Sequence, residues 1–127
     1  MSTIATAVKA DFEIVANLVR DNNGQQHAVP DIPAHIKLGK TVHYSSPDGE
    51  VTIEFRDDNS SPSLSPFLNP NGSEKIDISS NEPPIKLSKP GTFFCHCFIT
   101  PPGKAKADRI GWDKLNSPKS GGNHVVQ

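Results

Sequence analysis

The chain has 127 residues, enough for one domain that buries its own core without disulfide or metal staples. Thirteen basic and fourteen acidic residues give a formal net charge of -1, and neither sign is concentrated, so we expect no nucleic-acid and no membrane partner. No stretch approaches the roughly 18 consecutive apolar residues of a membrane span. The opening MSTIATAVKADFEIV lacks the basic start and apolar run of a secretory signal, so we expect a soluble, cytoplasmic protein.

Twelve prolines and nine glycines, with 34% hydrophobic residues, indicate short segments and many turns, which favours β structure over helices. The first candidate element is FEIVANLVR at 12–20, whose apolar spacing fits a helix nearly as well as a bulged strand. The DNNG turn at 21–24 follows it, and the next stretch contains two prolines that exclude a continuous helix. We therefore predict a strand that enters a hairpin.

Apolar alternation with a period of two begins near residue 34 and predicts half-buried strands. The alternating residues are Ile36 and Leu38, then Val42 and Tyr44, then Val51, Ile53 and Phe55. The breaks at 39–40 and 47–49 are short and rich in turn residues. We therefore expect consecutive strands to be antiparallel neighbours.

The polar, proline-punctuated segment 57–72 predicts a long surface loop, with Phe67 and Leu68 folded back onto the core. Further strands are predicted around 76–78, 85–87, 91–99 and 109–112. About seven short strands predict an all-β protein with one antiparallel or mixed two-sheet sandwich. We divide the chain into a flexible N-terminus at 1–11, a β-sandwich domain at 12–115 and a disordered tail at 116–127.

Two runs, AHIKLGKTVHYSSPDGEVTIEF and the later IKLSKPGTFFCHCF, resemble the cupredoxin-like pattern over about residues 34–99. That pattern is a strand, a glycine turn before TVxF, a loop, an apolar strand and a PGTYxYxC strand. Its most specific piece here is PGTF at 90–93. The resemblance implies a cupredoxin-like Greek key, and an immunoglobulin-like Greek key is the alternative.

The copper ligands of this family are matched only in part. Its copper proteins use an early histidine, then a cysteine, a histidine and usually a methionine near the end. Cys97 occupies the position of the cysteine, but FITPPGKAKADRI after it holds neither histidine nor methionine, and GEVTIEF holds no histidine. A trigonal copper site needs two imidazoles and one thiolate. The resemblance therefore implies the fold without a complete copper site.

The stretch GTFFCHCF at 91–98 places the only two cysteines on either side of a histidine. Because side chains alternate along a strand, Cys95 and Cys97 share one face and His96 lies on the other. We place the cysteines toward the core, where a free cysteine behaves as a small hydrophobe. Residues two apart on a strand lie about 6.5–7 Å apart, so a disulfide between them is disfavoured.

A metal site would combine Cys97 or Cys95 with a histidine such as His43, but a single C-x-C pair is a weak zinc signal. His43 and His96 belong to different sheets of a cupredoxin-like arrangement and would point to opposite exteriors. We therefore expect no metal cofactor, with copper or zinc as the alternative. His27, His35 and His43 recur every eight residues, and we interpret each as a solvent-facing position.

The other face of the cysteine strand carries Phe94, His96 and Phe98. Exposed aromatic side chains on one sheet face indicate that something covers them. We expect intramolecular cover, from the 60–70 loop, the N-terminal segment or Trp112. The alternative is a partner face that binds another protein or a second copy.

Three functions remain open. The first is a non-enzymatic, cupredoxin-like protein-binding or assembly module. The second is a metal-binding or electron-transfer protein that uses Cys95 and Cys97 with nearby histidines. The third, a small enzyme that uses Asp57 or Asp58, has no sequence motif behind it, so we expect no enzyme.

Overall fold

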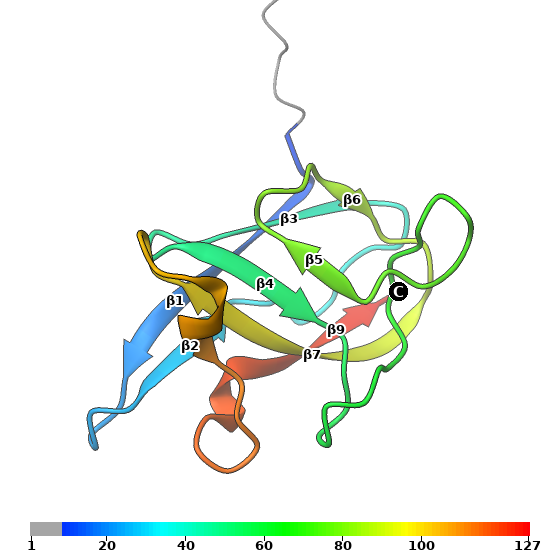
Figure 1. Ribbon diagram of the computed structural model, residues 1–127. Coiled ribbons are helices and arrows are strands. Elements are labelled where there is room, and N and C mark those ends of the chain that lie inside the picture. Colours follow the sequence, from blue (N-terminus) through cyan, green and yellow to red (C-terminus); the bar gives the residue numbers. More distant parts are fainter. Residues whose placement is uncertain (1–8) are drawn as a thin grey trace, which may run out of the picture.

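The computed structural model describes residues 9–127 and contains two β-sheets, which confirms the predicted all-β sandwich (Figure 1). One sheet has the order β2-β1-β3-β6, and the other has the order β5-β4-β7-β8 with β9 also paired to β7. In chain order the elements are β1 (Phe12–Arg20), β2 (Gln26–Pro30), β3 (Thr41–Ser45), β4 (Glu50–Glu54), β5 (Asp77–Ser79), β6 (Ile85–Lys86), β7 (Gly91–Thr100), the 3-10 helix η1 (Lys106–Asp108), β8 (Ile110–Gly111), the 3-10 helix η2 (Pro118–Ser120) and β9 (Gly121–Val126).

Within residues 9–127, no helix has the length and apolarity that a membrane crossing requires. Most of the flexible terminus expected at 1–11 lies outside the described residues.

Residues 12–20 form a strand, and β1 pairs antiparallel with β2 as the predicted hairpin. The turn favours a hairpin because Asp21 Oδ1 accepts hydrogen bonds from the backbone N–H groups of Asn23 (2.8 Å) and Gln25 (3.0 Å). Gly24 takes a φ of 81°, which a glycine adopts at no steric cost. Ile14 and Ala16 then fill alternate buried positions, which resolves the ambiguity between strand and helix.

Two expectations about the next strands are wrong. β3 and β4 are not neighbours: β3 lies parallel to β1 in one sheet, while β4 belongs to the other. The 47–49 turn therefore crosses between sheets, and a Cβ on Gly49 would come within 2.1 Å of the carbonyl oxygen of Thr100. The strand expected at 36–38 is also absent, because that segment bridges to the end of β9 through Ile36.

The expectation of a disordered tail at 116–127 is also wrong, because this segment contains β9. β9 runs antiparallel along β7 (Figure 1). The paired residues run from Gly91 opposite Val126 to His96 opposite Gly121. Both His124 (0% exposed) and Val126 (2%) point into the core. The segment has little apolar content, but backbone pairing along a central strand and two inward side chains are enough to order it.

The core lies between the two sheets and includes the inward side chains of every long strand. The loop after β4 folds back as predicted, because Phe67 is fully buried and packs edge to face on Phe55 at a centroid distance of 5.8 Å. The buried apolar residues are Ile14, Ala16, Ala28, Ile36, Val42, Tyr44, Val51, Ile53, Phe55, Phe67, Ile78, Leu87, Phe93, Cys95, Cys97, Ile99 and Val126.

One polar contact crosses this core. The hydroxyl of Tyr44 on β3 lies 2.7 Å from Nε2 of His124 on β9, which links one sheet to the other. Burial lowers the pKa of His124 to about 4, so the imidazole is neutral at pH 7. Burial also raises the pKa of Tyr44 well above its usual value.

We expect His124 to make the fold sensitive to acid. The unfolded chain binds a proton on this histidine near its ordinary pKa of about 6.5, whereas the folded chain does so only near pH 4. Stability is therefore lost as the pH falls from about 6.5 toward 4, by on the order of 2 kcal/mol between pH 7 and pH 5. Urea unfolding at both pH values should show a loss smaller by this amount in His124→Gln, and equal losses would contradict the assignment.

Candidate functional site

The two cysteines lie where the alternation predicts. Cys95 and Cys97 are both fully buried and unpaired on the inner face of β7. Burial raises the pKa of both thiols, to about 12 for Cys97. Neither sulfur is a thiolate at physiological pH, so both fill space in the core.

The metal set considered from the sequence is not brought together. His43 lies on β3, in the other sheet, where Nδ1 is 2.7 Å from Oε2 of Glu13 and Nε2 is 3.0 Å from the carbonyl oxygen of Ser80. Its strand and the cysteine strand thus lie in different sheets, as expected. Across residues 9–127, no group of three or more His, Cys, Asp or Glu side chains is placed to hold a metal ion.

Thiol labelling should distinguish the core position from a metal site. We expect Cys95 and Cys97 to react slowly with a disulfide reagent in the native protein and fast in denaturant, because burial and a raised pKa suppress the thiolate. Added Cu²⁺ or Zn²⁺ should not change these rates or produce visible absorption. Two thiols that react rapidly, and that a metal ion protects, would support the metal-binding alternative instead.

The outer face of β7 is covered by the chain itself. Trp112 stacks on His96 with a centroid distance of 4.1 Å and an interplanar angle of 10°, and Phe94 packs edge to face on Trp112 at 5.3 Å. His96 is consequently 1% exposed, which corrects its placement on the solvent side. Trp112 is thus one of the expected covers, and Ser63 of the expected 60–70 loop also lies beside Phe94. Phe94 and Phe98 remain half-buried.

Charged side chains extend this cover toward β4. The guanidinium of Arg109 lies 3.6 Å from the centroid of the Phe98 ring and donates from Nη1 to Glu54 Oε2 at 2.7 Å. Arg56 donates from Nε to the other oxygen of Glu54 at 3.1 Å. Burial alone would raise the pKa of Glu54, but the two guanidinium groups outweigh it and lower the pKa. The carboxylate is thus compensated by two cations.

A buried polar network ties the first hairpin to the C-terminal segment. His27 Nε2 lies 2.8 Å from Asp21 Oδ2, and Nδ1 lies 2.7 Å from Ser117 Oγ. Ser117 Oγ is in turn 2.8 Å from Ser120 Oγ, which accepts the backbone N–H of Ala28 at 2.8 Å. His27 is 3% exposed, so its predicted solvent-facing position is wrong, whereas His35 is exposed as predicted.

The order of groups in this network is that of an acid, base and hydroxyl triad. A nucleophile must reach its substrate, but Ser117 is 1% exposed and its Oγ already contacts a second hydroxyl. Sequence reasoning missed this cluster because His27 and Ser117 are 90 positions apart and neither lies in a motif. We assign the network a structural role.

Ser117→Ala should destabilise the protein without affecting any chemistry. Removing the hydroxyl leaves His27 Nδ1 buried without its partner, and we expect a loss of about 1–3 kcal/mol in the free energy of unfolding. Urea denaturation followed by far-UV circular dichroism measures it. The matched control is Ser88→Ala at an exposed serine, which should change stability by less than about 0.5 kcal/mol; equal effects would contradict the role of the network.

The aspartates considered for an enzyme lie in a surface turn. Asp57 Oδ1 accepts the backbone N–H groups of Asn59 (2.9 Å) and Ser61 (3.0 Å), and therefore caps the turn after β4. Asp58 is exposed beside it. Asp57 therefore stabilises this turn.

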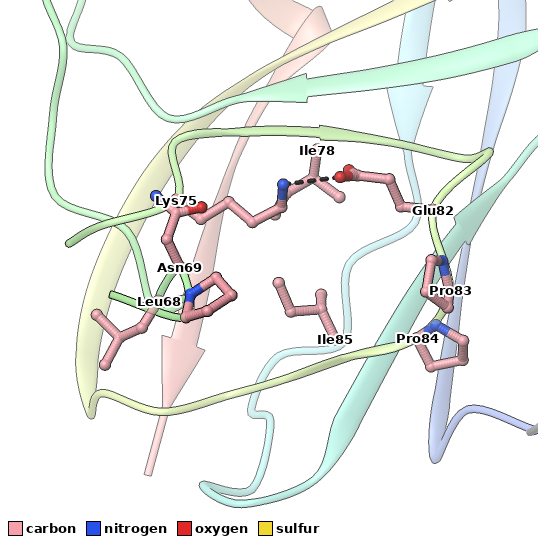
Figure 2. Close-up of a pocket in the computed structure, with 9 residues that line it drawn as sticks. Leu68, Asn69, Lys75, Ile78, Glu82, Pro83, Pro84 and Ile85 are labelled. Carbon is pink, nitrogen blue, oxygen red and sulfur yellow. Dashed lines mark hydrogen bonds and ion pairs between the residues drawn. The ribbon is translucent and has the colours of Figure 1, made fainter. Parts of the chain in front are cut away.

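An apolar groove of about 280 Å³ lies between β5 and β6, the edge strands of the two sheets (Figure 2). Figure 2 shows Leu68 and Asn69 on one side, Pro83 and Pro84 on the other, and Ile85 between them. The full lining is Leu68, Asn69, Pro70, Lys75, Ile78, Glu82, Pro83, Pro84 and Ile85. Its two charged side chains pair with each other, Lys75 Nζ to Glu82 Oε1 at 2.7 Å. The groove thus offers apolar surface and no free charge.

The backbone edge beside this groove is already occupied. Glu82 Oε2 accepts the N–H of Ser79 at 2.8 Å, and the Glu82 N–H donates to the carbonyl of Ser79 at 3.1 Å. The turn after β5 therefore closes most of that short edge, which guards it against the addition of a strand. A protein that bound in the groove would therefore contact it through a side chain and not through backbone pairing.

The opposite end of the molecule presents an exposed leucine. Leu115 is 87% exposed at the tip of a turn whose ends are joined by the Ser117 N–H to Asp113 carbonyl hydrogen bond at 2.9 Å. Asp113 Oδ1 also accepts the N–H groups of Leu115 and Asn116, each at 2.9 Å, and these backbone contacts lower the pKa of Asp113. These hydrogen bonds close the turn, and its apolar tip has no cover within the described chain.

A second groove, of about 430 Å³ and more polar, lies beside this turn. Its lining residues come from the β1–β2 turn, from Phe98 on β7 and from the segment around β8. They are Gln25, Gln26, Phe98, Ala107, Arg109, Ile110, Gly111, Trp112, Asp113 and Asn116. Sequence reasoning did not find this groove, because the turn and the 107–116 segment meet only through the folded β-sandwich.

Comparison with known proteins gives no relative: no family model matches, and neither curated proteins nor solved structures show a significant similarity. Function must therefore be argued from the geometry of the sites.

Proposed function

We propose that this chain is a non-enzymatic, cupredoxin-like assembly module whose apolar groove receives Leu115 of a second copy. The observation that carries the proposal is the groove of about 280 Å³ between β5 and β6, lined mainly by proline, leucine and isoleucine. The cupredoxin-like part is supported by the placement of β3 and β7 in different sheets. A cytoplasmic setting fits the two unpaired thiols.

The size of the groove favours a side chain over a small-molecule ligand. Ligand pockets hold about 300–1,000 Å³, whereas this groove holds about 280 Å³. Because Lys75 and Glu82 neutralise each other, its charge complements an uncharged occupant. A single aliphatic side chain meets both conditions.

Leu115 is such a side chain, and its position fixes the mode of assembly. The 112–117 segment and the β5–β6 edge lie at opposite ends of the molecule, so one copy cannot fill its own groove (Figure 1). Association between unlike surfaces is head to tail and does not close after two copies. We therefore propose short open chains of molecules.

The expected affinity is low. Burying one leucine contributes about 1.5–3 kcal/mol, whereas association costs an estimated ~4–15 kcal/mol in lost freedom. Contacts around the leucine must supply the remainder, so we expect a dissociation constant on the order of 1 mM or somewhat below. Assembly would then respond to local concentration.

Sedimentation velocity over a range of protein concentrations tests the proposal. We expect the average mass of the wild type to rise with concentration, and both Leu115→Glu and the double variant Pro70→Glu/Pro83→Glu to remain monomeric. Each variant keeps one intact surface, so an equal mixture of the two should form dimers and nothing larger. All three substituted positions are exposed, so folding should be preserved.

Leu64→Glu is the matched control, because Leu64 is 61% exposed and lies outside both surfaces. This variant should associate like the wild type. A wild type that stays monomeric at the highest attainable concentration would refute the proposal, as would a mixture of the two defective variants that forms no dimer.

A further inference from the structure

A second groove, more polar than the first, lies beside Trp112. Its volume of about 430 Å³ lies within the range of small-molecule sites, unlike the apolar groove at the other end. Its lining comes from the β1–β2 turn, from Phe98 on β7 and from the segment around β8. The site is therefore built from three parts of the chain that the fold holds in place.

The charges at this groove are compensated within the protein. Arg109 donates to Glu54 at 2.7 Å and lies over the Phe98 ring, so its cation already has an anion and an aromatic face. Asp113 accepts two backbone N–H groups. A charged ligand would have to compete with these contacts, so the groove favours a neutral one.

The remaining polar groups are carboxamides. Gln25 and Gln26 have no side-chain hydrogen bond to any residue in 9–127. Asn116 also lines the groove, and its side chain bonds to Asp113. A carboxamide both donates and accepts, and so does a hydroxyl group. Several carboxamides around one groove therefore match a ligand that carries many hydroxyls.

Aromatic surface completes the lining. Trp112 has one face on His96 and remains half-exposed, and Phe98 lies under the Arg109 guanidinium. Rings of this kind pack against the C–H groups of an apolar ligand face while leaving polar groups to the amides. The stack also fixes the indole, so little ordering is required when a ligand binds.

We propose that this groove binds a neutral saccharide, with Gln25, Gln26 and Asn116 bonding its hydroxyls and Trp112 packing against the sugar ring. The combination of a compensated arginine, two unpaired glutamine carboxamides and a stacked indole in one groove selects this ligand class. The site is separate from the apolar groove and does not depend on self-association.

Trp112 is the only tryptophan in the chain, so its fluorescence reports on this groove when the protein is kept dilute enough to be monomeric. Titrating the wild type at low concentration with cellotriose and maltotriose should give a saturable change in emission for at least one of them, with a dissociation constant on the order of 1 mM. Gln25→Ala/Gln26→Ala should weaken that binding about tenfold or more. Both glutamines are at least partly exposed, so the variant should fold, which its circular dichroism spectrum checks.

Asn81→Ala is the matched control, since it removes an exposed carboxamide from the β5–β6 turn and should bind the sugar like the wild type. The absence of a saturable response to either trisaccharide, by fluorescence and by NMR shift changes at Gln25 and Gln26, would overturn the proposal. Equal affinity in the Gln25→Ala/Gln26→Ala variant would also overturn it. Tighter binding of citrate, an anionic probe, than of the sugars would refute the inference of a neutral ligand.

Discussion

The contact between His27 and Ser117 fixes the position of the 112–117 segment, which contributes residues to both proposed binding surfaces. Its 2.7 Å distance joins the β1–β2 hairpin to the residues between β8 and β9. The segment that ends at Ser117 carries Trp112 over His96 and presents Leu115 at its tip. Without this anchor, the segment would be a surface loop with few apolar contacts, and loops of that kind open at low free-energy cost.

A few polar side-chain contacts join specific elements of the fold. Tyr44 and His124 form a hydrogen bond between the two sheets, and Glu54 holds two arginines over the outer face. Such contacts add little net free energy when intact but are costly when one partner is missing. They therefore specify which elements meet, while the apolar core provides most of the stability.

The period-two alternation was enough to predict the sandwich and the inward position of Cys95 and Cys97, because alternation follows directly from strand geometry. It could not show that β3 pairs in parallel with β1, since short turn-rich breaks serve hairpins and sheet crossings alike. β9 was missed because GGNHVV has few apolar residues and gains its order from pairing with β7. The grooves and the His27 network were beyond prediction, since they arise from contacts between distant segments.

The separation in sequence of these anchors has a kinetic consequence. His27 and Ser117 are 90 positions apart, and Tyr44 and His124 are 80 apart. Domains dominated by such non-local pairings fold in about milliseconds to seconds, because loop-closure entropy must be overcome before the contacts form. We therefore expect closure of these two long loops, which joins the last strand to the first half of the chain, to limit the folding rate.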